Sequence, residues 1–454
     1  MKIYYRFVPI ICCIFLLIEP AKAQDEVLQN YVQHGLDSNL IIQQKNLSLQ
    51  KALNGLQVAK SLYLPSVNVD ITYTEAQGGR SINLPVGDML NPVYNTLNAL
   101  TQSSNFPAIE NQQINFLPQN YYDAKIRTSM PLLNTDLGHN KNIKKNQIIL
   151  HENEVEIYKR ELVKQIKESY FNYNMALQVV AIYKSSWELA NESLRVNQKL
   201  IDAGKGLPAY LIRAQTEIAQ AEAQIVTAEQ QVKNTKIYFN SLLNRNMNAE
   251  ILISDSTQVT QELEKIDLLS LTYQKREELK SLQTNIEIQE SLYKMNKQFL
   301  VPKLNAFLDL GSQAEGLKFN NDSRYFMIGA QLQMPIFNGN RNRLKIQESK
   351  IDIADAKNKL AQAEQQLNMV VEVAKNEVVA ANKNYQQAQV QLESAGTYQR
   401  LIQKGFLAGV NTYIETIDAR TQYTSAKLAL NIQKYKLLTS LAKLERESAT
   451  YLFP

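Results

Sequence analysis

Two long stretches of the chain, 340–395 and 410–453, contain neither glycine nor proline. Because these residues are the strongest helix breakers, each stretch is predicted to form one continuous helix. Gly405 and Gly409 lie between the two stretches, and glycine accepts the positive φ that a helix end requires. The pattern predicts a long antiparallel helical hairpin whose tip lies near Gly409.

The same arrangement occurs 205 residues earlier in the chain. Ala203-Gly204 corresponds to Ala408-Gly409, and Ile212-Arg213-Ala214 corresponds to Ile417-Asp418-Ala419. The stretch 139–203, which precedes this first tip at Gly204, also lacks both breakers. As a helix it would reach roughly 100 Å. Two hairpins in one chain indicate an internal duplication, which is a signal at the level of the fold.

Apolar residues in both hairpins recur at alternating spacings of three and four. After the first tip they are Leu211, Ala214, Ile218, Ala221, Ile225, Ala228, Val232, Thr235, Phe239 and Leu242. Before the second tip they are Leu367, Val371, Ala374, Val378, Ala381, Tyr385, Ala388, Leu392 and Ala395. Such a repeat indicates left-handed supercoiling against a partner helix, so these positions are predicted to be packing seams.

Four shorter segments, 63–73, 122–132, 302–311 and 324–336, alternate apolar with polar residues. This period of two predicts β-strands with one apolar face, of the length that a tilted membrane strand needs. A soluble sheet with one wet face has the same alternation. Charges on the polar face and tyrosines near the strand ends favour a water-filled transmembrane barrel.

The order of these elements predicts seven parts of a mainly α-helical chain. They are an export signal (1–23), a first helix (24–62), a first strand pair with a long, irregular external loop at 74–120 (63–134), a first hairpin (135–248), a linker and the helix that opens the second repeat (249–300), a second strand pair (301–338), and a second hairpin with the C-terminus (339–454).

The first residues have the pattern of a cleaved export signal. A basic start precedes an apolar run from Phe7 to Ile18, and Ala21-Lys22-Ala23 has the small residues of a cleavage site. Both cysteines, Cys12 and Cys13, lie inside this run, so the mature chain is expected to have no disulfide and no thiolate site. No run of eighteen apolar residues follows, so a membrane role is expected to depend on β-strands.

Charge and motif content argue against an enzyme or a nucleic-acid-binding protein. Without the signal, 46 basic and 43 acidic residues remain, and they are interleaved rather than clustered. The three histidines, His34, His139 and His151, have no metal-ligand spacing. No phosphate-binding loop or nucleophile elbow is present. The sequence therefore predicts no catalytic residue, no metal and no cofactor.

The duplicated order of elements resembles the TolC family of outer-membrane efflux proteins over essentially the whole mature chain. Two strand-to-helix corners carry the resemblance, Met130-Pro131-Leu-Leu-Asn134 and Met334-Pro335-Ile-Phe-Asn-Gly339. The tips at Gly204 and Gly409, followed by Ala214 and Ala419, carry the rest.

That resemblance implies a homotrimer in the outer membrane, in which each protomer gives four strands to one twelve-stranded barrel. The long helices would form a tunnel across the periplasm, closed by the tips. Such a protein is a passive exit duct that works with an inner-membrane pump and a periplasmic adaptor. Physical chemistry also requires that protomers share one barrel, because four strands cannot close a barrel and open edges are not tolerated in lipid.

The resemblance also implies a gate. In the family, acidic residues on the outgoing helix of the second tip surround the narrowest point of the pore, and the matching residues are Glu415 and Asp418. The alternative is a solvated acid pair favoured by the helix dipole. Phe406 and Asn411 replace the family's Tyr and Arg near this tip, and Tyr210 replaces the acid of the first tip, so the gate is expected to be held differently.

Two other classes of protein share some of these features. A periplasmic adaptor also has a long helical hairpin, but it has one hairpin flanked by two halves of a β-domain. A structural coiled-coil protein of the envelope would not need four alternating strands. The duct is the favoured hypothesis because it accounts for two hairpins with strand pairs between their helices.

Overall fold

The computed structural model describes residues 23–117, 119–253, 267–268 and 270–453. The predicted mainly α-helical class is confirmed, and the chain divides into two compact units. The sheet unit comprises residues 51–148 and 286–355, and the hairpin unit comprises the remainder of the chain. Each unit therefore takes segments from both repeats. Apart from Ala23, the predicted export signal lies outside the described residues.

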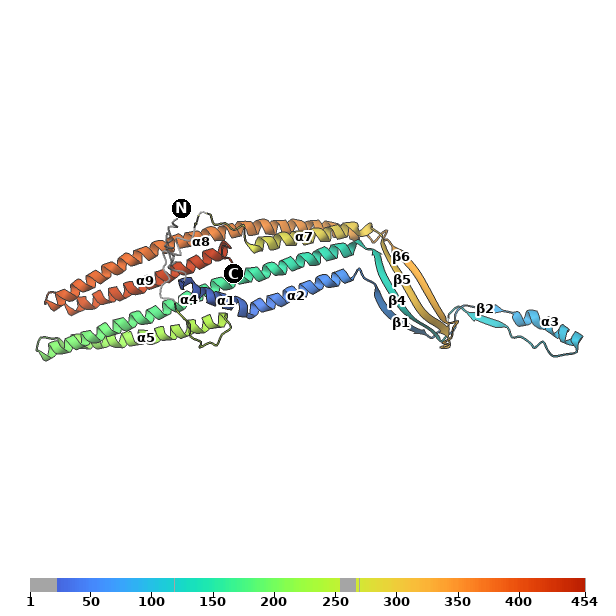
Figure 1. The fold of residues 1–454 in the computed structure, drawn as a ribbon, viewed down its shortest axis with the longest axis horizontal. Helices are drawn as coiled ribbons and strands as arrows, with labels where there is room; N and C mark the ends of the chain where they lie inside the picture. The colour runs from blue at the N-terminus through green and yellow to red at the C-terminus, as the bar shows by residue number, and fades with distance from the viewer. Residues whose placement is uncertain (1–22, 118, 254–266, 269, 454) are drawn as a thin grey trace, which may run out of the picture. The chain divides into compact units, whose positions relative to one another are not determined.

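A four-stranded antiparallel sheet forms the centre of the sheet unit (Figure 1). Its strands are β1 (Ser66–Thr74), β4 (Tyr121–Leu133), β5 (Lys303–Glu315) and β6 (Arg324–Gln333). Their order is β1-β4-β5-β6, so the pairing of β4 with β5 joins the two repeats. Strands β1 and β6 are the two edges of this sheet.

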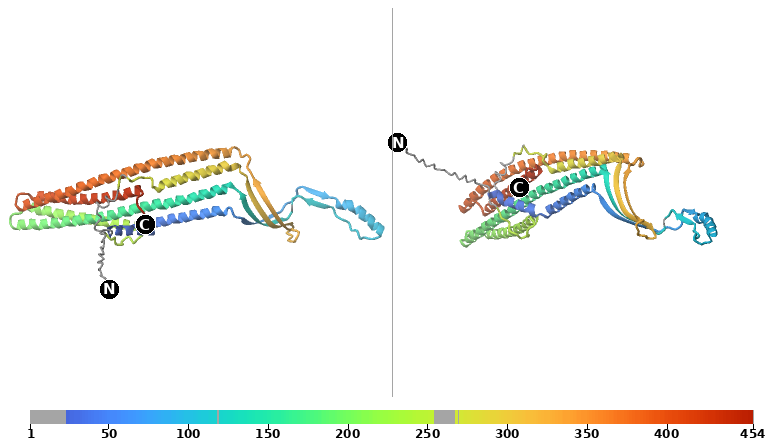
Figure 2. Two further views of the ribbon diagram at one scale, coloured as in Figure 1. Left: turned by 45° about the horizontal axis from the view of Figure 1, so that its top comes forward. Right: turned by 45° about the vertical axis from the view of Figure 1, so that its right-hand side comes forward.

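Four helices reach one end of this sheet (Figures 1 and 2). α2 leads into β1, β4 leads into α4, α7 leads into β5 through the short helix η1, and β6 leads into α8. Because the strands are antiparallel, all four connections lie at the same end. Their bounds are α2 (Leu40–Ser61), α4 (Thr135–Asp202), α7 (Glu277–Lys297), η1 (Gln298–Leu300) and α8 (Arg341–Leu407).

The strand register confirms the predicted alternation of an apolar and a polar face. One row across the apolar face consists of Val69, Ile126, Leu310 and Phe326, all exposed. On the polar face, Asn68 lies opposite Arg127, and Arg127 lies opposite Asp309. The Arg127 guanidinium donates to both carboxylate oxygens of Asp309, at 2.8 and 2.6 Å. Ion pairs therefore concentrate on one face of the sheet.

The predicted single helix over 24–62 is wrong, because it is interrupted at Asn39. α1 (Ala23–Ser38) ends there and α2 begins at Leu40. The Asn39 side-chain oxygen accepts from the backbone N–H groups of Ile41 and Ile42, at 2.9 and 3.3 Å, as an N-cap does. Its amide nitrogen donates to the Leu242 carbonyl at 3.2 Å. A tertiary contact therefore fixes the break.

The predicted irregular loop over 74–120 is also wrong in part. β2 (Ser81–Leu84) pairs with β3 (Gln112–Asn115), and α3 (Val86–Thr101) lies between them with Pro92 inside it. The Asn91 side chain accepts from the Ile109 N–H at 2.8 Å and donates to the Ile109 carbonyl at 2.9 Å. Such amide contacts hold the returning chain against α3 without any periodic pattern in the sequence.

The hairpin unit is built from two helical hairpins. α4 pairs with α5 (Pro208–Leu242), and α8 pairs with α9 (Tyr413–Glu447) (Figure 1). Many predicted seam residues are buried: Ala214, Ala221, Ala228, Phe239, Val371, Ala374, Val378, Ala381 and Ala388. The small alanine side chains allow the helices to pack closely. No helix among the described residues is both long and apolar enough to cross a membrane.

A buried ionic cluster joins the C-terminal end of α9 to the N-terminal end of α7. Arg276 is 3% exposed and donates to Glu447 and Glu278, each at 2.5 Å. Arg446 also contacts both carboxylates. Burial opposes ionisation of Glu278, but the hydrogen bonds and charge of Arg276 outweigh it and hold the pKa of that carboxyl below its usual 4.5.

Candidate gate at the hairpin tips

Glycine forms the turn at both predicted tips. Gly204 has φ +72° and Gly409 has φ +77°, in the left-handed region that glycine enters without steric cost. Gly405 has a different role from the predicted one, because it lies inside α8. A Cβ there would lie 1.9 Å from the side-chain oxygen of Asn411, so this glycine permits a close approach. Only Gly409 reverses the chain at the second tip.

Glu415 closes a capping box at the start of α9. The Glu415 N–H donates to the Thr412 hydroxyl at 3.3 Å, and the Glu415 carboxylate accepts from the Thr412 N–H at 2.6 Å. Asn411 donates to the same carboxylate oxygen at 3.3 Å. These bonds, led by the one from the Thr412 backbone, lower the pKa of Glu415 below its usual 4.5. The side chain is therefore held in place as an exposed anion.

Asp418 lies three residues further along α9 and is also exposed. Its carboxylate accepts from the Gln422 amide at 2.7 Å. Residues three apart lie on one face of a helix. The two carboxylates are thus presented from the same side of the first turns of α9.

An aromatic cluster joins the two hairpins behind these acids. Tyr413 is 1% exposed and packs against Tyr210 and Phe406, with ring centroids 5.0 and 6.0 Å away. Ala214, Ile417 and Leu194 complete this small core. The Ser193 hydroxyl donates to the Tyr413 hydroxyl at 3.1 Å. The predicted gate residues Tyr210 and Phe406 therefore hold the tips together by packing.

Arg420 makes an ionic contact between the two hairpins near their tips. Its guanidinium donates to Glu217 on α5 at 2.9 Å and to the Leu189 carbonyl on α4 at 3.0 Å. The side chains of Arg420 and Glu217 are 12% and 16% exposed. Burial raises the pKa of Glu217 above its usual 4.5, although the positive charges of Arg420 and Arg213 oppose the shift.

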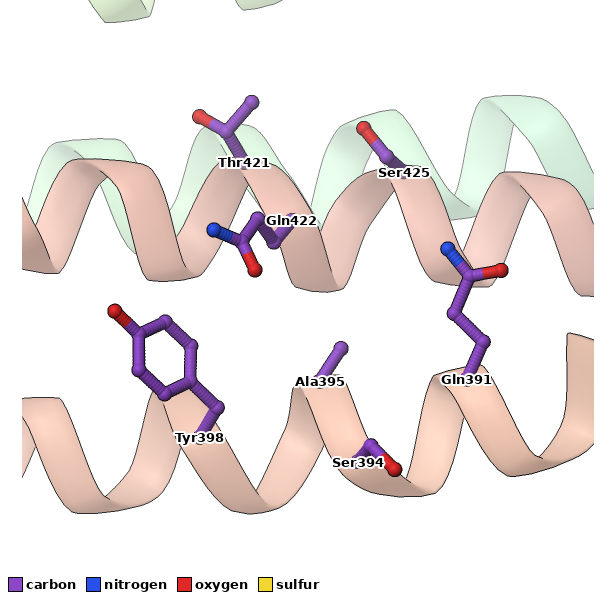
Figure 3. A pocket seen from close by; sticks show the side chains of 7 residues that line it. All are labelled: Gln391, Ser394, Ala395, Tyr398, Thr421, Gln422 and Ser425. Atoms are coloured by element: carbon purple, nitrogen blue, oxygen red, sulfur yellow. The ribbon is translucent and has the colours of Figure 1, made fainter.

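A shallow polar hollow of about 380 Å³ lies between α8 and α9, one to two turns behind the acids. Figure 3 shows Tyr398 and Gln391 extending from α8 toward α9, with Ala395 between them. Thr421, Gln422 and Ser425 line the opposite wall, and Ser394 completes the lining. The α8–α9 hairpin thus presents a polar depression beside its tip.

The predicted corner residues belong to the sheet unit rather than to the tips. Pro131 lies near the end of β4, where the register with β5 shifts. Pro335 follows the end of β6, and Gly339 has φ +64° just before α8. Each corner thus contains a backbone irregularity close to the point where a strand gives way to a helix.

Sequence reasoning missed Tyr413, Arg420 and Glu217. The Thr412–Glu415 spacing is a capping-box pattern that the sequence does display. The Arg420–Glu217 pair has no such local signal, because it depends on how α9 lies beside α5. The structure brings Phe406 and Tyr210 together around Tyr413, whereas Asn411 belongs to the helix cap.

Comparison with known proteins places this geometry among outer-membrane channels. The family model described as outer membrane efflux protein matches residues 32–245 and 268–448. The alkaline protease secretion protein AprF of Pseudomonas aeruginosa is 21% identical over 315 residues. That alignment covers 66% of this chain and 63% of the length of AprF.

Solved structures share the fold at low sequence identity. The CmeC outer membrane channel of Campylobacter jejuni is 15% identical with a TM-score of 0.72, covering 93% of this chain and 85% of that one. The open state of the MtrE outer membrane channel of Neisseria gonorrhoeae is 14% identical with a TM-score of 0.72, covering 93% and 88%.

Proposed function

Because the chain belongs to the outer membrane efflux protein family, we propose that it is a passive exit duct in the outer membrane. It carries substrates from the periplasm or the cytoplasm to the exterior and performs no chemistry on them. The observation that carries this proposal is the open sheet β1-β4-β5-β6, which has an apolar face, a charged face and two unpaired edges.

The two edges explain why the duct is an oligomer. In lipid an unpaired strand edge leaves backbone groups without partners, each at a cost of several kcal/mol. Edge β1 of one copy pairs with edge β6 of the next, which closes the sheet. From the resemblance to the TolC family we propose three copies and twelve strands.

The two faces of the sheet then have different surroundings. The row of Val69, Ile126, Leu310 and Phe326 faces the lipid of the outer membrane. The face that carries the Arg127–Asp309 pair lines a water-filled lumen. The hairpins extend the lumen into the periplasm and close it at the tips.

Glu415 and Asp418 form the gate in this proposal. Three copies around the axis bring six carboxylates to the narrowest point, where they attract cations. The capping box fixes the position of each Glu415 carboxylate, which supports a ring of defined geometry. Phe406 and Tyr210 hold the tips through Tyr413, and Asn411 holds Glu415.

The duct works with an inner-membrane pump and a periplasmic adaptor. The polar hollow between α8 and α9 is the surface that we assign to the adaptor, because it is exposed and lined by hydrogen-bonding side chains. AprF is named for protease secretion, and CmeC is named as a channel. The cargo of the present duct is chosen by its pump.

Single-channel recording of the double variant Glu415→Gln/Asp418→Asn tests the gate. Block by added divalent cations should weaken by roughly tenfold or more, because neutral amides keep the shape and remove the charge. The matched control is Glu364→Gln/Glu393→Gln, which neutralises two carboxylates on α8. Cations should block the control channel as strongly as they block the parent channel. Unchanged block in the first variant would overturn the carboxylate ring.

Gel migration and carbonate extraction test whether the protein is embedded in the outer membrane. A closed barrel migrates differently before and after heating, and a protein embedded in the membrane stays with the membrane after a carbonate wash. An adaptor or a structural coiled-coil protein should show neither behaviour, so extraction by carbonate would exclude the duct.

A further inference from the structure

Exposed basic side chains gather where the four helices meet the sheet. We call the following residues the basic collar: Lys60 on α2, Lys141 and Lys145 on α4, Lys294 and Lys297 on α7, and Arg341, Arg343 and Lys345 on α8. All belong to the sheet unit. Each lies within about 15 Å of the end of its helix that leads to the sheet, taking about 1.5 Å of rise per helical residue.

Acidic residues are scarce in the same helix turns. Over 51–61, 135–147, 291–297 and 341–347, Asp136 is the only acid, and Glu290 and Glu348 lie next to the last two segments on the side away from the sheet. Its carboxylate accepts from the ammonium of Lys303 and is thereby neutralised. Ion pairs among the described residues do not include any member of the collar. The collar therefore carries a net positive charge.

Both repeats carry lysine at equivalent places in the collar. Lys60 lies four residues before Leu64-Pro65, and Lys297 lies four residues before Val301-Pro302. Lys141 and Lys345 each lie ten residues after the corner proline, Pro131 or Pro335. The basic character is thus present in both halves of the duplication.

Exposed apolar side chains separate the collar from the strands. Ile336 and Phe337 are 82% and 81% exposed, and Leu64 and Leu300 are 64% and 60% exposed. A band of apolar residues beside a band of cations matches the boundary between lipid tails and phosphate headgroups.

A hollow at the end of α7 has the same two-sided character. It measures about 570 Å³ and is lined by Lys294, Lys297, Gln298, Leu300, Val301 and Pro302. The Gln298 side-chain oxygen lies 2.8 Å from a ring nitrogen of His139, which fixes that side chain. Two lysines and three apolar residues therefore line one hollow, a combination that suits a phosphate attached to an acyl chain.

We propose that the basic collar binds the headgroups of anionic phospholipids in the leaflet that faces the periplasm. This inference rests on the proposed function, which places the strands in the membrane. The collar attracts the phosphates, and the exposed leucine, isoleucine and phenylalanine side chains contact the tails. Anionic lipid would thus fix the depth at which the sheet sits in the bilayer.

Lipid binding to the purified full-length protein tests the proposal. The double variant Lys294→Gln/Lys297→Gln removes two collar charges, and Lys205→Gln/Lys233→Gln removes two exposed charges from the hairpin unit as a control. Binding of dioleoyl phosphatidylglycerol and of dioleoyl phosphatidylcholine is measured by native mass spectrometry. Heat-modified migration confirms that each variant is folded.

The parent and the control should prefer phosphatidylglycerol, and the collar variant should lose roughly tenfold of that preference. Added salt should weaken the preference of the parent. Equal preference in the collar variant and the parent would overturn the proposal. A parent that conducts in pure phosphatidylcholine without preferring phosphatidylglycerol would overturn the collar alone, whereas failure to insert into any bilayer would overturn the duct itself.

Discussion

Replacing Arg420 by methionine is expected to loosen the contact between the two hairpin tips. Methionine keeps much of the length of the side chain but removes the bonds to Glu217 and to the Leu189 carbonyl. Glu217, which is 16% exposed in the parent, would lose its cation, and one of its oxygens already lacks a hydrogen-bond partner. The tips would separate to hydrate this carboxylate.

The free-energy cost of this substitution follows from the burial of the Arg420–Glu217 pair. Breaking a fully buried ion pair costs about 3–5 kcal/mol. Both Arg420 and Glu217 keep some exposure, and the raised pKa of Glu217 lets the lone carboxyl take up a proton, so about 2–3 kcal/mol is expected. At about 1.4 kcal/mol per factor of ten, the ratio of open to closed tips should rise roughly 30- to 150-fold.

Single-channel recording and hydrogen exchange of the tip segments measure this change. The open fraction should rise, and exchange should accelerate in the residues around Tyr413. Arg400→Met removes an exposed arginine from α8 and is the matched control. Arg420→Met/Glu217→Met, which leaves no unpaired charge, should recover part of the closed fraction. The reasoning is refuted if Arg420→Met opens the channel no more than Arg400→Met does.

Three further variants or conditions test other parts of the structure. Asp309→Ala leaves Arg127 without its carboxylate and should lower the temperature at which the protein changes gel migration, whereas unchanged migration would show that the pair contributes little. Thr412→Ala removes the cap of α9 and should cost about 1 kcal/mol, seen as faster exchange in its first turn, while Thr216→Ala should leave that turn unchanged. The pKa of Glu278 lies below its usual 4.5, so its stabilisation is present above that pH and is lost as the pH falls through the lowered value. Glu278→Gln should therefore flatten the acid dependence of unfolding in the hairpin unit, and an unchanged dependence would contradict this assignment.

Repetitive features of the fold could be predicted from the sequence. The seams around Ala214 and Val371 and the alternation through Val69 and Ile126 each repeat over many residues, so one error in the pattern does not hide it. The tips at Gly204 and Gly409 follow from a requirement for positive φ that few other residues satisfy.

Features fixed by tertiary contacts could not be predicted. Asn39 breaks the first helix because its side chain caps α2 and contacts Leu242, which lies far along the chain. The structure within the segment 74–120 depends on single amide contacts such as those of Asn91. At the hairpin tips, the Arg420–Glu217 pair requires two hairpins in register, which no local pattern specifies.

A cysteine cross-link between copies tests the central claim most directly. The claim is that edge β1 of one copy pairs with edge β6 of the next. Val69→Cys is combined in turn with a cysteine substitution at each β6 position from Phe326 to Leu332. The native Cys12 and Cys13 lie in the predicted export signal, so the mature chain is expected to have no other thiol. A disulfide requires Cα atoms within about 7 Å, so oxidation links only strands that pair. The account predicts a covalent species of three chains at one or two neighbouring β6 positions. The absence of any such species, with both thiols accessible, would contradict it.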